Sequence, residues 1–260
     1  MTHPDYQTPE NQSRWLEKRF PGLFLYSKII QVVLAASRRC SRNIYTSNDI
    51  IDGSTRILRT VECIGGNVFV DNKSAFIDLK GPCVFTANHM SALEAFILPC
   101  FIMPHRKVTF VIKKSLTKFP ILKHAINSLQ PIVVDRRNPR KDLRAVLDQG
   151  FDFLNKNISV LIFPQTTRSL HFDPTQFNTL GIKLAKKSHL PIVPIALKTD
   201  AWSKGRHLKD FGKIDPSRPV RMAFGNPVHI TGNGKQEHQQ ILDFIGNKLR
   251  SWAILGTSYN

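Results

Sequence analysis

The sequence predicts an α/β fold in which a mostly parallel central sheet is flanked by helices, with an amphipathic helix near the N-terminus. From residue 83 onward, short apolar runs typical of buried strands alternate with longer amphipathic segments typical of helices. Strands that alternate with helices in this way form parallel sheets covered on both faces. A chain of 260 residues, 42% of them hydrophobic, is long enough to bury such a core.

Residues 1–45 combine a polar segment with one predicted helix. Apolar residues recur at helical spacing over residues 20–36, and Lys28 and several arginines add positive charge. This composition is typical of a helix that lies in a membrane interface, although a helix packed on the domain core has the same periodicity. The stretch is too polar for a spanning helix and lacks the small-residue cleavage site of a signal peptide. Its apolar positions are Phe24, Leu25, Ile29, Val32, Val33 and Ala36.

Residues 46–260 predict a single domain. Residues with high β-propensity between Gly, Asn and Asp predict short β-rich segments at 56–63, 67–70 and 74–79. Five strands are then predicted at 83–87, 108–112, 132–134, 159–163 and 192–197, with helices between them at 93–101, 116–129, 140–154 and 177–187. A last strand at 220–224 precedes a helix at 236–249.

Composition limits the classes of function. Lys and Arg number 37 against 19 Asp and Glu, so the formal net charge is +18. Such a charge indicates an anionic partner: nucleic acid, a membrane surface or a phosphorylated substrate. The four cysteines form no C-x-x-C pair, which argues against a disulfide framework or a zinc site. We therefore expect no metal, and reduced thiols in a cytoplasmic compartment.

The polar turns that follow the buried strands are the candidate sites, because ligands of such sheets bind beyond the carboxyl ends of the strands. His89 and Glu94 follow the first of these strands. They suit a general base and its orienting carboxylate, provided that His89 precedes the helix, since positions five apart on a helix are about 140° out of line. The alternative is a turn histidine and a favourable charge in the first helical turn.

Two further turns carry arginine. Arg168 lies among hydroxyl and amide side chains in the segment 163–169, and its guanidinium suits a phosphate or carboxylate. A capped loop with a solvated arginine would look the same. Arg136 follows the strand at 132–134, where a surface pair between Asp135 and Arg137 would explain the charges without a ligand.

Taken together and in this order, the turns resemble the glycerolipid (lysophospholipid) acyltransferase family over roughly residues 55–230. The family blocks N-H-x-S-x-x-D, K-x-E-L, an arginine after a strand, F-P-E-G-T-R-S and V-P-V-A-I correspond to residues 88–94, 113–116, 135–136, 163–169 and 193–197. The resemblance implies transfer of a fatty acyl group to the free hydroxyl of a lysophospholipid such as lysophosphatidic acid. The donor would be acyl-CoA or acyl-carrier protein, which are co-substrates, and no further cofactor is implied.

The same resemblance implies roles for individual residues. His89 would be the general base and Glu94 its orienting carboxylate, whereas the other motif residues would bind substrates. The implied phosphate ligands are Arg136, Arg168 and Thr167, the acceptor contacts are Gln165 and Thr166, and the possible donor or phosphate contacts are Lys113 and Lys114.

This chain departs from the family pattern in two blocks. Glu94 stands where Asp is usual, which keeps a carboxylate, whereas Gln165 and Thr166 replace Glu and Gly. The F-P-Q-T-T-R-S string is similar to that of a bacterial subfamily, so we expect a lineage variant, in which the two replacements bear on the identity of the acceptor more than on the type of reaction. We expect it to work as a peripheral or monotopic protein at the cytoplasmic face of the inner (plasma) membrane, in phospholipid biosynthesis.

Two alternatives stay open at this point. A catalytically weak homologue that only binds lipid is conceivable because Gln165 is neutral. A basic nucleic-acid-binding protein would also explain the charge, but the basic residues are spread over the chain without a zinc finger, RNP string or basic zipper.

Overall fold

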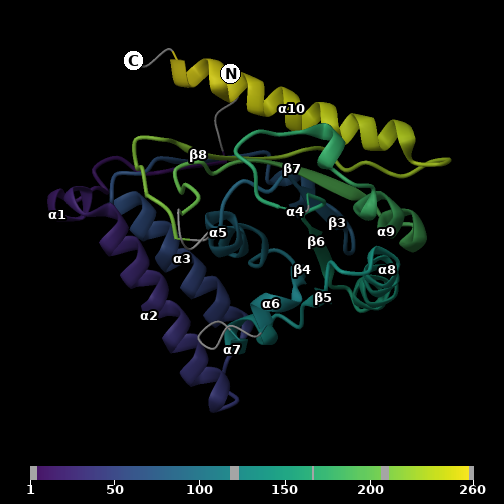
Figure 1. Cartoon of the computed structure of the whole chain (residues 1–260), viewed down its shortest axis with the longest axis horizontal. Coiled ribbons are helices and arrows are strands. Elements are labelled where there is room, and N and C mark those ends of the chain that lie inside the picture. Colours follow the sequence, from purple (N-terminus) through teal and green to yellow (C-terminus); the bar gives the residue numbers. More distant parts are fainter. Residues whose placement is uncertain (1–4, 118–122, 166, 206–210, 258–260) are drawn as a thin grey trace.

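The structure is a computed structural model that describes residues 5–117, 123–165, 167–205 and 211–257 (Figure 1). Its centre is an eight-stranded sheet with the order β1-β2-β8-β7-β3-β6-β4-β5. The strands are β1 (Tyr6–Gln7), β2 (Val68–Asp71), β3 (Val84–Ala87), β4 (Val108–Lys113), β5 (Ile132–Val134), β6 (Ser159–Ile162), β7 (Ile192–Lys198) and β8 (Val220–Phe224).

Most strand pairs in this sheet are parallel. Strand β3 runs parallel to β6 and β7, β4 runs parallel to β5 and β6, and β2 runs parallel to β8. The pairs β7–β8 and β1–β2 are antiparallel. The predicted α/β class with a mostly parallel central sheet is therefore confirmed. The carboxyl ends of β7, β3, β6, β4 and β5 all lie at one edge of the sheet.

Helices cover both faces of the sheet (Figure 1). Neighbouring residues of a strand point to opposite faces, so Phe85 packs in one hydrophobic cluster with α2, α3 and α5, whereas Val84 packs in a second with α8, α9 and α10. The helices are α1 (Trp15–Arg19), α2 (Pro21–Ser41), α3 (Ser47–Cys63), α4 (Ser74–Ile77), α5 (Leu93–Ile102), α6 (Lys114–Thr117), α7 (Lys123–Ser128), α8 (Pro139–Asn155), α9 (Leu180–Ser188) and α10 (Lys235–Thr257), with a 3₁₀ turn η1 (Pro174–Gln176).

The predicted helix over residues 20–36 is present as α2, and its predicted apolar face is a core face. Leu25, Ile29, Val33 and Ala36 are buried, and α2 packs on α3 and α7. A second apolar stripe of α2, formed by Leu23, Ile30 and Leu34, is exposed. Within the described ranges, no helix is both long and apolar enough to cross a membrane.

Two of the predicted β-rich segments are wrong. Residues 56–63 belong to α3, whose start is fixed by a capping box between Thr46 and Asp49. Buried residues recur there at helical spacing, so burial of one helical face against α5 overrides the β-propensity of Ile, Thr and Val. Residues 74–79 contain α4 rather than a strand. The predicted strand at 67–70 is confirmed as β2.

The remaining predictions hold with shifted boundaries. The helix predicted at 116–129 corresponds to α6 and α7, while residues 118–122 lie outside the described residues. The helix predicted at 177–187 begins later, at Leu180, after η1. Strand β1 was not predicted, because the N-terminal segment is polar. It joins the edge of the sheet through β2, and the Tyr6 hydroxyl donates to the buried Glu62 carboxylate.

Candidate active site

Asn88 fixes the position at which the chain leaves strand β3. Its side-chain amide donates to the carbonyl of Leu197 in β7 at 2.8 Å, and its oxygen accepts from the Leu197 N–H at 2.8 Å. The buried side chain thus continues the β3–β7 hydrogen-bond ladder by one step after the strand ends. The turn that follows starts from a rigid point in the middle of the sheet edge.

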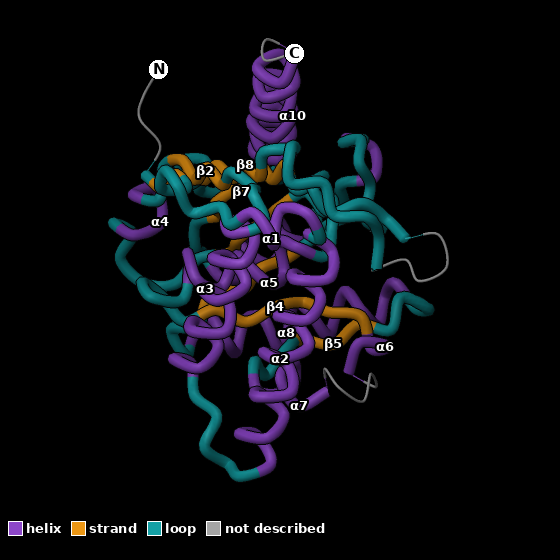
Figure 2. Tube along the Cα trace, turned by 90° about the vertical axis from the view of Figure 1, so that its left-hand side faces the viewer, coloured by secondary structure: helices purple, strands orange, loops and turns teal. Residues whose placement is uncertain are grey.

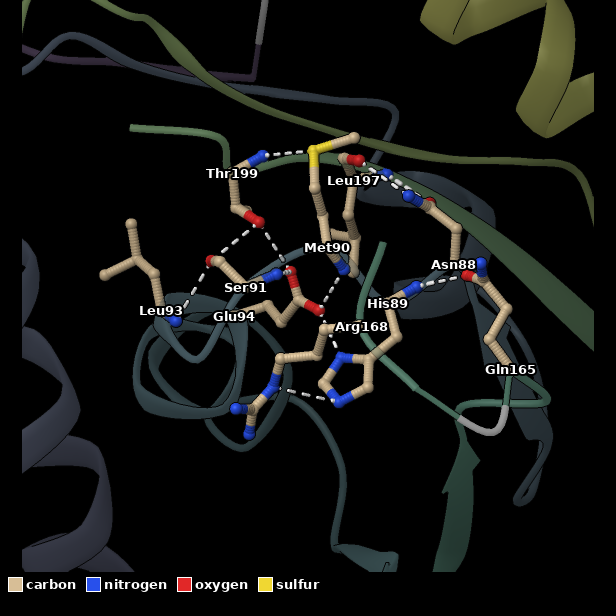
Figure 3. Close-up of polar contacts among 10 residues, drawn as sticks. All are labelled: Asn88, His89, Met90, Ser91, Leu93, Glu94, Gln165, Arg168, Leu197 and Thr199. Carbon is tan, nitrogen blue, oxygen red and sulfur yellow. Dashed lines mark hydrogen bonds and ion pairs between the residues drawn. The ribbon is translucent and has the colours of Figure 1, made fainter. Parts of the chain in front are cut away.

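His89 and Glu94 meet as the sequence predicts (Figure 3). His89 lies in the turn before α5, and its Nδ1 is 2.5 Å from Oε1 of Glu94, in the first turn of that helix. A carboxylate accepts, so Nδ1 carries the proton and Nε2 is left as the acceptor. His89 retains 13% side-chain exposure, whereas Glu94 has none. This is the geometry of a general base held by a buried carboxylate.

Four donors hold the Glu94 carboxylate. Oε1 accepts from His89 and from the Met90 N–H at 2.9 Å, and Oε2 accepts from the Ser91 N–H at 3.3 Å and the Thr199 hydroxyl at 2.6 Å. Ser91 donates in turn to Thr199 at 2.9 Å. Each oxygen of the buried carboxylate thus accepts two hydrogen bonds, which fixes the orientation of Glu94.

Thr199 is the site residue that the sequence reasoning missed. It follows β7 directly, at the same sheet edge as His89, and its side chain is buried. Site residues of parallel sheets gather beyond the carboxyl ends of the strands. The position of Thr199 just beyond the predicted strand 192–197 is the signal in the sequence that points to it.

The turn after β6 supports His89 from the other side. The Phe163 ring stacks on the His89 ring with centroids 4.3 Å apart. Oε1 of Gln165 accepts from the backbone N–H of His89 at 2.6 Å. The Gln165 side chain is buried, so this bond fixes the backbone of the histidine. Thr167 is exposed, and Thr166 lies outside the described residues.

Arg168 reaches the open nitrogen of the histidine. Its Nε donates to Nε2 of His89 at 3.3 Å (Figure 3). Burial lowers the pKa of Arg168, the Glu94 carboxylate raises it, and the positive charge of Arg136 lowers it. The charge of Arg136, in the turn after β5, therefore acts on Arg168, in the turn after β6.

The turn after β5 is held in an uncommon backbone conformation. Arg136 has φ of 62°, which costs energy for any residue except glycine. The Asp142 carboxylate of α8 stabilises this turn by accepting from the Asp135 N–H at 3.0 Å and the Arg136 N–H at 2.7 Å. Arg137 lies 4.0 Å from Asp135 and is exposed. The expected contact between Asp135 and Arg137 thus exists. The backbone of Arg136 is held by a different group, the carboxylate of Asp142.

The cations lie to one side of the histidine along the sheet edge. In the order β7-β3-β6-β4-β5, Thr199 and His89 come first, then Arg168, Lys113 and Arg136. Lys113 pairs in register with Val134, the last residue of β5, so it lies next to the turn that carries Arg136. Lys113 and Lys114 are both exposed. This edge of the sheet therefore places His89 beside a positively charged stretch, whose charge suits an anionic ligand.

The chain belongs to the Acyltransferase family. The family model described as Acyltransferase matches residues 60–198, which is more than half of the chain and contains every predicted site residue. Among the described residues, no three His, Cys, Asp or Glu side chains gather into a group that could hold a metal ion.

Within that family the similar proteins share one description. The chain is 33% identical over 154 residues to the 1-acyl-sn-glycerol-3-phosphate acyltransferase of Pseudomonas aeruginosa, covering 59% of this chain and 56% of that protein. It is 32% identical over 128 residues to the enzyme of the same name from Limnanthes douglasii, covering 48% of this chain and 45% of that protein. The chain thus spans about half the length of these relatives.

A solved structure shares the fold. The crystal structure of the 1-acyl-sn-glycerophosphate (LPA) acyltransferase PlsC from Thermotoga maritima superposes with a TM-score of 0.68, covering 91% of this chain and 96% of that one. The sequence identity is 16%, so this likeness bears on the fold alone.

Proposed function

We propose that this protein is a 1-acyl-sn-glycerol-3-phosphate acyltransferase, which moves a fatty acyl group from an acyl thioester to the free hydroxyl of a lysophospholipid such as lysophosphatidic acid. The observation that carries this proposal is the assembled His89–Glu94 pair, with Arg168 at the open ring nitrogen. The donor is acyl-CoA or acyl-carrier protein, which present the same thioester.

The proposed reaction needs a base but no enzyme nucleophile. The acceptor hydroxyl donates to Nε2 of His89, and its oxygen attacks the thioester carbonyl while Nε2 takes the proton. Glu94 stabilises the imidazolium by accepting from its Nδ1–H, since Oε1 of Glu94 lies 2.5 Å from Nδ1 of His89. When the tetrahedral intermediate collapses, the C–S bond breaks and the thiolate takes the proton from Nε2. The products are a diacyl lipid and a free thiol.

The acceptor phosphate would bind on the cationic side of the edge. Arg168 and Arg136 are the principal ligands in this proposal, with Thr167 beside them and Lys113 or Lys114 in reach of the phosphate or the donor. When the phosphate draws the Arg168 guanidinium, Nε2 of His89 is released to the acceptor hydroxyl. In this way phosphate binding and base activation are linked.

We propose two different roles for the residues that replace the usual Glu and Gly. Gln165 acts chiefly on His89, because its oxygen already accepts from the histidine backbone. Thr166 contacts the acceptor and helps to select it. Because the amide oxygen of Gln165 supports the His89 backbone as a carboxylate oxygen could, the replacement favours a variant acceptor preference over a loss of activity.

Replacing Arg168 by alanine tests the phosphate site. We expect the apparent KM for lysophosphatidic acid to rise roughly 10- to 100-fold, which corresponds to the loss of a hydrogen bond to a charged group. The KM for the acyl donor should change little. The matched control is Arg137→Ala, since Arg137 also lies in a turn that follows a strand of the sheet but has an exposed side chain. An Arg168→Ala enzyme with unchanged acceptor KM would remove Arg168 from the phosphate site.

We propose further that residues 1–45 contact the cytoplasmic face of the inner membrane, while 46–260 form the acyltransferase domain. Besides the exposed stripe Leu23, Ile30 and Leu34 of α2, the nearby Trp15 of α1 and Phe20, which directly precedes α2, are exposed, Trp15 to 81%. An apolar surface of this kind next to a net charge of +18 suits a peripheral protein on an anionic bilayer.

Replacing Leu23 by aspartate tests the membrane contact. We expect the affinity for phospholipid vesicles to fall about tenfold or more, because a leucine loses its burial and a negative charge replaces it. The control is Ile254→Asp in α10, since Ile254 is 67% exposed and Leu23 is 68% exposed. Vesicle sedimentation measures both variants. Equal losses in the two variants would contradict a specific contact through α2.

A further inference from the structure

A concave surface lies between α1, α2 and α3, away from the sheet edge that carries His89 and Arg168, which we call the catalytic edge. Its volume is about 480 Å³. Four cationic side chains, one carboxylate and an aromatic ring are among the residues that line it, and they are Arg14, Lys28, Arg56, Arg59, Glu17 and Phe24. These three helices lie on the side of the molecule that faces the viewer in Figure 2. We call this surface the α1–α3 groove.

Three of the four cations of the groove, Arg14, Lys28 and Arg56, are only weakly compensated by the carboxylates that the structure describes. Lys28 donates to the neutral amide of Gln31 at 3.3 Å. Arg14 and Arg56, both with exposed side chains, pair with Glu17 and Asp52 at 3.6 and 3.9 Å, and such long pairs of exposed arginines contribute little. A ligand can replace these pairs at small cost.

Arg59 is different, because it supports the protein itself. Its guanidinium is 3.0 Å from the buried carboxylate of Glu62, which also accepts from Tyr6. Removing Arg59 would leave that buried charge without its cation, which is strongly destabilising. Lys28 and Arg56 are therefore the residues to change in a test.

The groove opens beside the exposed apolar stripe of α2. At 3.6 residues per turn, the groove residues of α2, Phe24 and Lys28 among them, point about 90° away from the stripe formed by Leu23, Ile30 and Leu34. The core-facing residues of the helix point to a third side. A lipid whose acyl chains lie along the stripe would bring its phosphate to the mouth of the groove.

The groove is separate from the catalytic edge. The residues of α3 that line it, such as Arg56 and Arg59, lie opposite Ser54, whose hydroxyl donates to the Phe96 carbonyl of α5 at 2.6 Å. Helix α3 therefore stands between the groove and α5, which carries Glu94. The groove shares none of its lining residues with the site around His89.

We propose that the α1–α3 groove binds the phosphate of an anionic phospholipid that is not the substrate, and so holds the protein on anionic bilayers. Guanidinium and ammonium groups supply the phosphate contacts, and Phe24 supplies an apolar wall beside the glycerol. This inference rests on the proposed membrane contact but not on the proposed acyl transfer.

The test is the double variant Lys28→Gln with Arg56→Gln. Sedimentation compares vesicles of phosphatidylcholine alone with vesicles that also contain phosphatidylglycerol. We expect affinity for the phosphatidylglycerol vesicles to fall roughly 10- to 30-fold, as for two cations lost at the surface, and affinity for phosphatidylcholine vesicles to stay within about twofold. Transfer to acceptor dispersed in detergent should also stay within about twofold, which separates a failure here from a failure of the proposed activity.

The control variant removes the same charge elsewhere. It combines Lys235→Gln with Arg250→Gln in α10, both exposed, and Arg250 resembles Lys28 in that it donates to a neutral amide, that of Asn247. We expect the affinity of this variant for phosphatidylglycerol vesicles to fall by less than about threefold. An equal loss in both double variants would show attraction by net charge alone and would overturn the proposal.

A calorimetric titration with a short-chain, water-soluble phosphatidylglycerol decides whether the groove is a saturable site. We expect one molecule to bind the unaltered protein and the Lys28→Gln, Arg56→Gln variant to lose that binding. Inorganic phosphate at the same concentration should not compete, because it lacks the glycerol and acyl groups. Competition by phosphate would assign the groove to free phosphate, and the absence of saturation would overturn the site.

Discussion

Replacing His89 by alanine should lower the rate of acyl transfer at least about 100-fold, the usual contribution of a general base. The ring is the group that presents an acceptor nitrogen at the catalytic edge while its other nitrogen is held at 2.5 Å from Glu94. Without it, the acceptor hydroxyl must attack the thioester without losing its proton. The measurement is a single-turnover assay with a labelled acyl donor, read by mass spectrometry of the lipid product.

Two controls make the His89→Ala result specific. His229→Ala removes an exposed histidine from the same chain and should leave the rate unchanged. The unfolding transition of His89→Ala should stay close to that of the unaltered protein, because His89 supplies only one of the four hydrogen bonds to Glu94. Undiminished transfer by a folded His89→Ala enzyme would refute the proposed mechanism.

Replacing Glu94 by glutamine should cost at least about 100-fold in kcat and also weaken the fold. The side chain keeps its shape, but one oxygen becomes an NH₂ group that faces donors. His89 can then adopt the tautomer in which Nε2 carries the proton and no longer serves as a base. Each buried donor left without an acceptor costs roughly 1–3 kcal/mol of unfolding free energy. Chemical denaturation and steady-state kinetics on the same preparation measure both effects.

Two milder substitutions separate the effect of the negative charge of Glu94 from the effect of its hydrogen bonds. Thr199→Val removes one donor to Oε2 and keeps the carboxylate, so its kcat should fall by no more than about tenfold. Glu94→Asp keeps the charge on a shorter side chain and should retain more activity than Glu94→Gln. If Glu94→Gln were as active as Thr199→Val, the negative charge at this position would have no part in orienting or stabilising His89.

The strand-helix alternation from β3 to β7 could be predicted because its signals are local. Buried strands such as β3 and β6 are largely continuous apolar runs, and helices α8 and α9 carry apolar residues at a 3.6-residue period. The contact between His89 and Glu94 could be predicted as well, because the two residues are only five positions apart, on either side of the start of α5. The β-rich segment predicted at 56–63 was wrong because the β-branched residues of this short window favour a strand, whereas the whole of α3, Ser47–Cys63, has a strong helical period.

The sequence by itself determined the α/β class, the motif residues at the strand ends and the presence of an apolar helix near the N-terminus. Only the tertiary structure decided which stripe of α2 is buried, that Thr199 holds Glu94 from β7, and that Arg168 reaches Nε2 of His89. The physical reason is that these contacts join elements that are distant along the chain. The order of the strands in the sheet brings Thr199 to Glu94, and the helices that pack on α2 bury Leu25 and leave Leu23 exposed. Local patterns specify elements and turns, whereas contacts between remote elements specify the site.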